Sequence, residues 1–178
     1  IVARLDPIKG HTVFLEAAAS VIKRNDNFKF LIVGEGHVQY VQKLRVLANR
    51  LGLNDHVIWL GGCNEVVPIY SAIDLLASAS LGEGFSNVIG EAMSCGIPCV
   101  VTNVGDSARI VQNTGLVVKP GDADELANAM LHSFDKENRA ELKPVLRTCI
   151  KEKFSISAMT AATIDALHTL CKEGLWTS

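Results

Sequence analysis

Two glutamates in the stretch GEGFSNVIGEAMSCGIPCVVT, residues 82–102, have a type and spacing suited to recognising hydroxyl groups. Glu83 stands between two glycines, and Glu91 follows eight residues later. Glycines let a backbone pass close to a ligand, and either Ser86 or Asn87 is a good residue to begin a helix. The start of that helix would offer free N–H groups and a positive dipole end to a phosphate. A glutamate in a surface turn is more often solvated than functional, so the pattern alone leaves both interpretations open.

Two cations near the start of the chain could neutralise the same phosphates. In ARLDPIKGH, Arg4 ends an apolar run and Lys9 lies in the loop that follows. Arginine offers a planar fork of donors and lysine a compact charge, and both suit a diphosphate. The alternative is an ordinary pair of surface cations, which the spacing alone does not exclude.

Other motifs in the sequence are weaker. LIVGEGHVQY places Gly34 and Gly36 after an apolar run, but Gln39 stands where a dinucleotide fingerprint needs its third glycine. The histidines show no metal-ligand spacing, so we expect no metal site and a surface or partly packed place for each of them: His11, His37, His56, His132 and His168. The cysteines show no CxxC spacing and are expected to be buried thiols of a reducing compartment. They are Cys63, Cys95, Cys99, Cys149 and Cys171.

The elements that must position these residues alternate along the chain. Apolar runs of strand length are followed by segments with apolar residues at helical spacing, such as Phe14, Ala17, Ala18 and Val21. The expected strands cover residues 1–4, 28–34, 56–61, 74–80, 97–102 and 115–118. Strands that are apolar throughout and alternate with helices call for a parallel sheet covered on both faces. We therefore predict an α/β, doubly wound, Rossmann-like sheet of about six strands, with ligands at the carboxyl ends of the strands.

Composition limits the classes of partner. The 178 residues carry 17 Lys plus Arg against 19 Asp plus Glu, and 48% are hydrophobic. This balance argues against a nucleic-acid surface. The apolar runs are far shorter than the roughly 20 residues of a membrane-spanning helix. The composition is that of an ordinary globular domain, and the expected location is the cytoplasm.

Five segments together resemble the retaining GT-B glycosyltransferases of family 4, also called group 1. The segments are ARLDPIKGH, FLIVGEG, VIWLGG with VVPIYSAIDLLASAS, GEGFSNVIGEAMSCGIPCVVT, and GLVVKPGDADELANAM. The most specific feature is the pair Glu83 and Glu91 followed by AMSCGIPCVVT. In that family the resembling domain is the C-terminal half, which binds the nucleotide sugar.

The resemblance implies roles for single residues. Arg4 and Lys9 would hold the donor diphosphate and stabilise the leaving charge with no metal or other cofactor. Glu91 would bind the ribose hydroxyls, and Glu83 would contact the donor sugar near the reacting carbon. The distal phosphate and the sugar would be cradled by Gly84, Phe85, Ser86, Asn87 and Val88. The nucleobase would lie near Gly62 and Cys63.

The resemblance also implies what lies around this domain. Residues 1–178 are expected to form a single nucleotide-sugar-binding domain of a longer protein, without the N-terminal domain that supplies the acceptor site. The acceptor would be a glycan or a lipid-linked sugar, reached through that domain, and the enzyme could sit at the cytoplasmic membrane face. A helix near Ile156 to Leu170 crosses towards the other domain in the family, so we expect an exposed apolar strip on it and along the strand rim.

The resemblance thus implies transfer of a sugar from a nucleoside diphosphate sugar to an acceptor hydroxyl with retained configuration, in glycan, polysaccharide or glycolipid biosynthesis. The domain by itself is expected to be inactive in transfer. Two alternatives remain, a nucleotide-sugar epimerase of GT-B architecture and a non-catalytic nucleotide-sugar-binding module. The Arg4 and Lys9 pair with Glu83 and Glu91 argues against the epimerase. Cys63 and Asn64 stand where many relatives have a charged residue, so the base, like the sugar and the acceptor, stays open.

Overall fold

The strands of this chain are all parallel and form two adjoining sheets. The computed structural model describes residues 1–134 and 139–172. In one sheet β1 (Phe30–Val33) pairs with β2 (Val57–Gly61), and in the other β4 (Cys99–Thr102) lies between β3 (Leu76–Ser78) and β5 (Leu116–Val118). The predicted α/β class with a parallel sheet is confirmed.

The strand expected at residues 1–4 is present as two isolated bridges. Val2 pairs with Val33 and Leu5 with Gly36, both in the parallel direction, and Ala3 donates to the Val33 carbonyl over 2.9 Å. The described part of the chain therefore has five strands where about six were expected. The difference has a local cause, because the segment soon gives way to the short 3-10 helix η1 (Pro7–Lys9), which begins with a proline.

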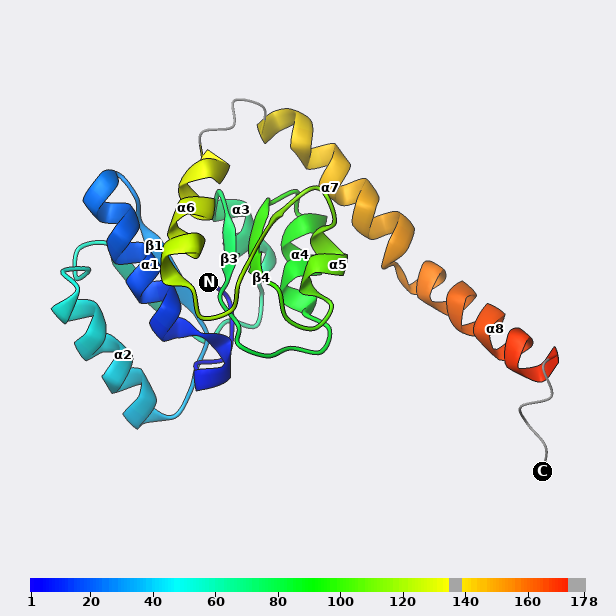
Figure 1. Ribbon diagram of the computed structural model, residues 1–178, viewed down its shortest axis with the longest axis horizontal. Helices are drawn as coiled ribbons and strands as arrows, with labels where there is room; N and C mark the ends of the chain where they lie inside the picture. Colours follow the sequence, from blue (N-terminus) through cyan, green and yellow to red (C-terminus); the bar gives the residue numbers. More distant parts are fainter. Residues whose placement is uncertain (135–138, 173–178) are drawn as a thin grey trace.

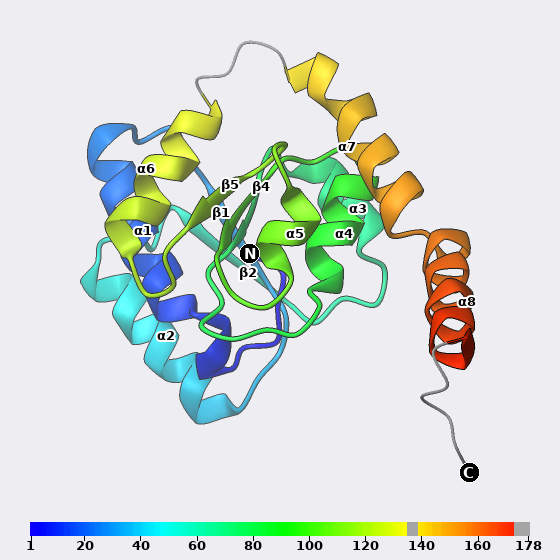
Figure 2. The ribbon, with the colours of Figure 1, turned by 45° about the vertical axis from the view of Figure 1, so that its right-hand side comes forward.

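Helices cover both sides of the strands (Figures 1 and 2). One layer consists of α1 (His11–Arg24), α2 (Val38–Arg50) and α6 (Ala123–Phe134). The other consists of α3 (Val67–Ala72), α4 (Asn87–Ser94), α5 (Ser107–Val111) and α7 (Arg139–Lys153). This arrangement is the doubly wound layering that the sequence predicts.

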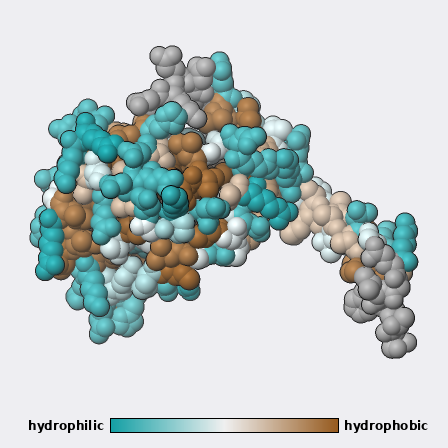
Figure 3. All heavy atoms as spheres, viewed as in Figure 1, coloured by the Kyte–Doolittle hydropathy of each residue, from teal (hydrophilic) through white to brown (hydrophobic). Residues whose placement is uncertain are grey.

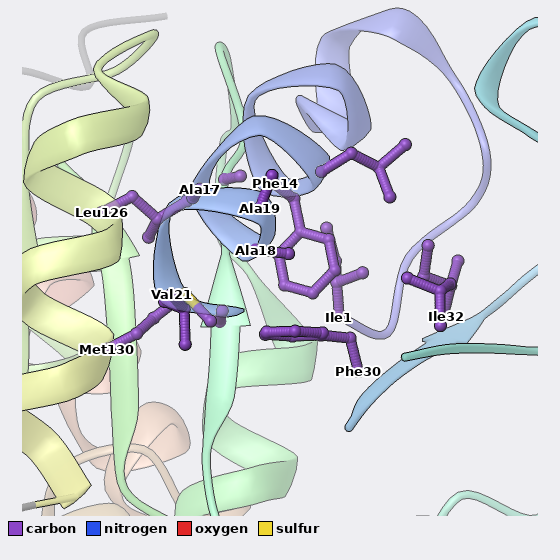
Figure 4. Packing of buried hydrophobic residues seen from close by; sticks show 14 of the residues in the cluster. Ile1, Phe14, Ala17, Ala18, Ala19, Val21, Phe30, Ile32, Leu126 and Met130 are labelled. Atoms are coloured by element: carbon purple, nitrogen blue, oxygen red, sulfur yellow. The ribbon is translucent and has the colours of Figure 1, made fainter. Parts of the chain in front are cut away.

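Each layer buries its own apolar cluster against the strands. On the α1 side, Phe14 and Phe30 meet edge to face with ring centroids 5.9 Å apart (Figure 4). On the α4 side, Ile89 and Met93 pack with Leu146 of α7, and all three are fully buried. The two clusters fix α1 and α4, the helices that border the candidate site.

Asp122 and Glu125 form half of a capping box at the start of α6. The Asp122 carboxylate accepts from the Glu125 N–H over 2.8 Å, as a cap residue should. The Glu125 carboxylate instead accepts from the Lys119 N–H over 3.0 Å, so the reciprocal bond goes to a residue further upstream.

The last described helix, α8 (Ile156–Lys172), extends away from the layered body (Figure 1). It has no buried residue, and apolar side chains that include Ile156 and Met159 are exposed along it. Hydrophobic atoms are visible on this projecting helix in Figure 3. The part of the expected exposed apolar strip that falls on this helix is confirmed.

Two expectations about single residues are wrong. His11 is fully buried, because it is the first residue of α1 and the helix is packed from its first turn. Cys63 and Cys171 are exposed, since one lies in a surface loop and the other near the end of α8. Among the described helices, none combines the length and the apolar character needed to span a bilayer.

Candidate active site

The candidate site lies at the carboxyl ends of the strands, where the loops after them meet the start of α4. Two adjoining pockets, of about 230 and about 450 Å³, share Arg4 and Val88 as lining residues. Both predicted ends of a nucleotide-sugar site are thus side by side. A larger hollow, of about 780 Å³, lies elsewhere and is lined mainly by apolar residues such as Phe30, Leu75 and Met130. Lys29 and Asp74 also line this hollow, but none of the predicted site residues does.

The smaller pocket contains the predicted catalytic residues. Arg4, Lys9 and Glu83 line it together with the loop into α4. Lys9 Nζ lies 2.6 Å from Glu83 Oε1, and the two side chains are only 21% and 11% exposed. The Arg4 side chain is exposed and makes no ion pair or hydrogen bond within the described part of the chain. One cation is therefore available to an anionic ligand, while the other is already engaged.

The position of Lys9 depends on the turn that follows it. The Asp6 carboxylate accepts from the Ile8 N–H over 3.1 Å and begins η1, and Lys9 ends it. Gly10 then adopts a left-handed conformation with φ of 67°, and a Cβ there would overlap the Ala79 carbonyl. The close approach of Gly10 to Ala79 at the end of β3 brings Lys9 to Glu83.

Glu83 is held by a short polar chain that sequence reasoning did not find. The Ser80 hydroxyl donates to Glu83 Oε1 over 2.8 Å, and the Thr102 hydroxyl donates to the Ser80 carbonyl over 2.6 Å. Ser80 and Thr102 are both buried. Both residues had a signal in the sequence, because their hydroxyl groups come at the ends of two neighbouring parallel strands and such ends meet at one edge of the sheet.

The loop before α4 supplies the rest of the smaller pocket. Phe85, Ser86, Asn87 and Val88 all line it, while Gly84 precedes them, with open space where a Cβ would be. Ser86 is the residue before the first turn of α4, as expected, but its hydroxyl makes no capping bond. The first N–H groups of an α-helix have no intrahelical acceptor, so the start of α4 can receive an anion.

The loop after β4 packs against the backbone of the loop before α4. The Asp106 N–H donates to the Gly84 carbonyl over 2.9 Å. Gly105 has φ of 51°, and a Cβ there would overlap the carbonyl oxygens of Glu83 and Gly84. The loop after β4 therefore fixes the backbone of the Glu83 loop.

The larger pocket of the pair contains Glu91 and the residues expected to bind the base. Gly62, Cys63 and Asn64 line it together with Glu35. Tyr70 donates its hydroxyl to Glu91 Oε2 over 2.9 Å, and the Tyr70 side chain is fully buried. Burial and the nearby Glu91 carboxylate raise the pKa of Tyr70, so it stays a donor. Tyr70 was also missed, although a tyrosine on an apolar helix face usually needs a partner for its hydroxyl.

The chemistry available is that of anion and hydroxyl recognition. One free cation, a second cation shared with a carboxylate, and a helix start surround the smaller pocket, and a carboxylate fixed by Tyr70 borders the other. Among residues 1–134 and 139–172 no group of three His, Cys, Asp or Glu is placed to hold a metal ion.

Comparisons with known proteins find similar sequences in one enzyme family. Residues 1–136 match the family described as Glycosyl transferases group 1. The chain is 32% identical over 139 residues to an Escherichia coli UDP-Gal:alpha-D-GlcNAc-diphosphoundecaprenol alpha-1,3-galactosyltransferase, with 76% of the chain and 36% of that protein covered. It is 34% identical over 149 residues to a GDP-mannose-dependent alpha-(1-6)-phosphatidylinositol monomannoside mannosyltransferase of Mycobacterium tuberculosis, with 78% of the chain and 38% of that protein covered.

Solved structures show the same fold. HepE of Anabaena in complex with UDP superposes with a TM-score of 0.85 at 27% identity, over 94% of the chain and 47% of that protein. The C-terminal domain of LpcC, a group 1 glycosyl transferase family protein of Francisella tularensis, superposes with a TM-score of 0.76 at 23% identity, over 86% of the chain and 83% of that domain. The chain thus spans less than half of HepE and most of the isolated LpcC domain.

Proposed function

The chain belongs to the group 1 glycosyltransferases, and from that premise we propose that it binds the nucleoside diphosphate sugar for a retaining transfer to an acceptor hydroxyl. The single observation that carries the proposal is the convergence of Arg4, Lys9 and Glu83 with the start of α4 on one pocket. That combination suits a diphosphate joined to a sugar, because cations and helix N–H groups bind phosphates while a carboxylate accepts from hydroxyls.

The second pocket gives the bound nucleotide its direction. Glu91 borders it and would accept from the ribose hydroxyls, with Tyr70 holding the carboxylate in place. The nucleobase would extend towards Gly62 and Cys63. The diphosphate would bridge the two pockets at Arg4, which lines both.

In the transfer step the charges at the smaller pocket would act on the leaving group. Breaking the bond between the sugar and the diphosphate leaves negative charge on the phosphate oxygens. Arg4, Lys9 and the start of α4 would stabilise that charge. Donors and cations that are already in place where charge develops lower the activation free energy of the transfer step. Glu83, which lines the same pocket, would hold the sugar.

The relatives suggest the class of acceptor. Two of them are named for acceptors that are lipid-linked, a sugar on diphosphoundecaprenol and a phosphatidylinositol monomannoside. We therefore place the complete enzyme in glycan, polysaccharide or glycolipid biosynthesis, with a lipid-linked sugar or glycan as acceptor, at the cytoplasmic face of a membrane.

Calorimetric titration with UDP, GDP and their sugar conjugates tests the proposal. Arg4→Ala should weaken binding of the preferred nucleotide by about 1.5–3 kcal/mol, the range for a charge-assisted hydrogen bond. Arg50→Ala, at the exposed end of α2, is the matched control and should leave the affinity unchanged. Equal affinities for the Arg4 variant and the unchanged protein would count against the proposal.

A further inference from the structure

Lys9 already shares its ammonium group with Glu83, so its charge is partly compensated before any phosphate binds. The 2.6 Å contact joins two side chains that are largely removed from water, so the pair is screened less than an exposed one. A diphosphate at the start of α4 needs the same ammonium group. Glu83 and the phosphate are therefore competing anions for one cation.

The hydrogen bonds of Glu83 show what remains when Lys9 leaves. Both Lys9 and Ser80 donate to Oε1, and within the described residues Oε2 accepts no hydrogen bond. Ser80 is buried and is anchored through its carbonyl to Thr102, so it can keep the carboxylate in position. The freed carboxylate then needs new donors, and the hydroxyls of a sugar supply them.

We propose that Glu83 acts as a competitor of the donor phosphate for Lys9, so that the site favours the intact nucleotide sugar over the free nucleoside diphosphate. This inference rests on the proposed function and concerns the selectivity of the same site. With free nucleoside diphosphate, the Lys9–Glu83 contact is lost and Glu83 keeps only the Ser80 hydroxyl as a donor, which costs free energy for a carboxylate in a partly buried place. With the sugar attached, its hydroxyls donate hydrogen bonds to Glu83 and replace the lost contact with Lys9. The pair thereby promotes release of the nucleotide product after transfer.

The test compares Glu83→Gln with Glu35→Gln by calorimetry, using UDP or GDP and the matching nucleotide sugar. Glu83→Gln should tighten binding of the free nucleoside diphosphate about fivefold, corresponding to roughly 1 kcal/mol, and should weaken or leave unchanged binding of the nucleotide sugar. Glu35 lines the adjoining pocket without contacting Lys9, so its variant measures the general effect of removing a negative charge. An equal increase in affinity for the free nucleoside diphosphate in Glu83→Gln and Glu35→Gln would overturn the inference.

A double-mutant cycle assigns the effect to Lys9. In a Lys9→Ala background, Glu83→Gln should increase the affinity for the free nucleoside diphosphate no more than Glu35→Gln does, because no lysine is left to be released. A gain that persists in full would contradict the inference.

The pair itself can be tested without any ligand. Thermal unfolding of the unchanged chain, the two single variants and the double variant should show a non-additive change in melting temperature. Additive changes would overturn the inference even if the nucleotide binds as proposed. No binding of any nucleoside diphosphate to the unchanged chain would instead refute the proposed function, and with it this use of the pair.

Discussion

At the scale of single residues, the site depends on side chains that position the predicted ones. Glu83 and Glu91 were found from their spacing, but Ser80, Thr102 and Tyr70 hold them in place. Hydrogen bonds between residues distant in sequence leave no local pattern. For that reason the carboxylates could be predicted from sequence and their supports could not.

Tyr70→Phe isolates the support of Glu91. The change removes one hydroxyl and keeps the ring, which is fully buried. We expect nucleoside diphosphate binding to weaken by about 0.5–1.5 kcal/mol, the usual net value of one hydrogen bond. Calorimetry measures the change, with Tyr40→Phe on α2 as the control.

Glu91→Gln should weaken the binding of the nucleotide and of the nucleotide sugar alike. An effect confined to the sugar conjugate would show that Glu83 and Glu91 have exchanged roles.

His11 predicts how stability depends on pH. Burial lowers the pKa of His11 to about 4 from 6.5. The nearby Asp6 backbone opposes the shift, but among the described residues neither ring nitrogen makes a hydrogen bond of good geometry. Because the unfolded chain takes up the proton first, stability is full above pH 6.5 and is lost as the pH falls towards 4, by about 3 kcal/mol in all.

Thermal unfolding between pH 7 and pH 4.5 measures this loss. His11→Leu removes the titrating group while keeping an apolar side chain of similar bulk at the buried position. The variant should show a flatter profile over that window than the unchanged chain. Identical slopes for the two proteins would mean that other groups cause the pH dependence.

At the scale of elements, sequence pattern was a good guide where burial is periodic. The ends of β1, β2, β4 and β5 lie within two residues of the predicted strands, and the helix carrying Glu91 begins at the expected position. The five-residue α5 was not predicted, because one turn and a half gives too little periodicity to recognise. The interruption at residues 1–5 was also not foreseen, since it depends on pairing with β1 and on the early turn into η1.

The loop after β4 carries a prediction of its own. Gly105→Ala introduces a Cβ against the backbone of Glu83 and Gly84 at a position with positive φ. It should lower the free energy of unfolding by more than about 1 kcal/mol and weaken binding of the sugar nucleotide, because the Glu83 loop must move. Chemical denaturation and calorimetry measure the two effects.

Gly90→Ala is the matched control for that variant. Gly90 lies within α4 with open space where a Cβ would go, so the substitution should be neutral or stabilising. A Gly105 variant as stable and as tightly binding as the Gly90 variant would contradict the supporting role of this loop.

At the scale of the whole molecule, the two C-terminal helices differ in how they are used. α7 packs on α4 through Leu146, which is fully buried, whereas Leu167 of α8 is 48% exposed. Leu146→Ala should cost about 2–5 kcal/mol of stability. Leu167→Ala should change it by less than about 0.5 kcal/mol. Urea denaturation of the two variants measures the contrast, and a comparable loss in both would mean that α8 packs on the body in solution.

We propose that a nucleoside diphosphate binds across the two adjoining pockets at the carboxyl ends of the strands. A proton–nitrogen correlation NMR titration of the 178-residue chain with UDP or GDP locates the binding site directly. We expect the largest amide shifts on Asn87 and Val88 at the start of α4 and on Gly62 and Cys63 in the second pocket. Shifts confined to the apolar hollow around Phe30, Leu75 and Met130, or no shifts with any nucleotide, would contradict it.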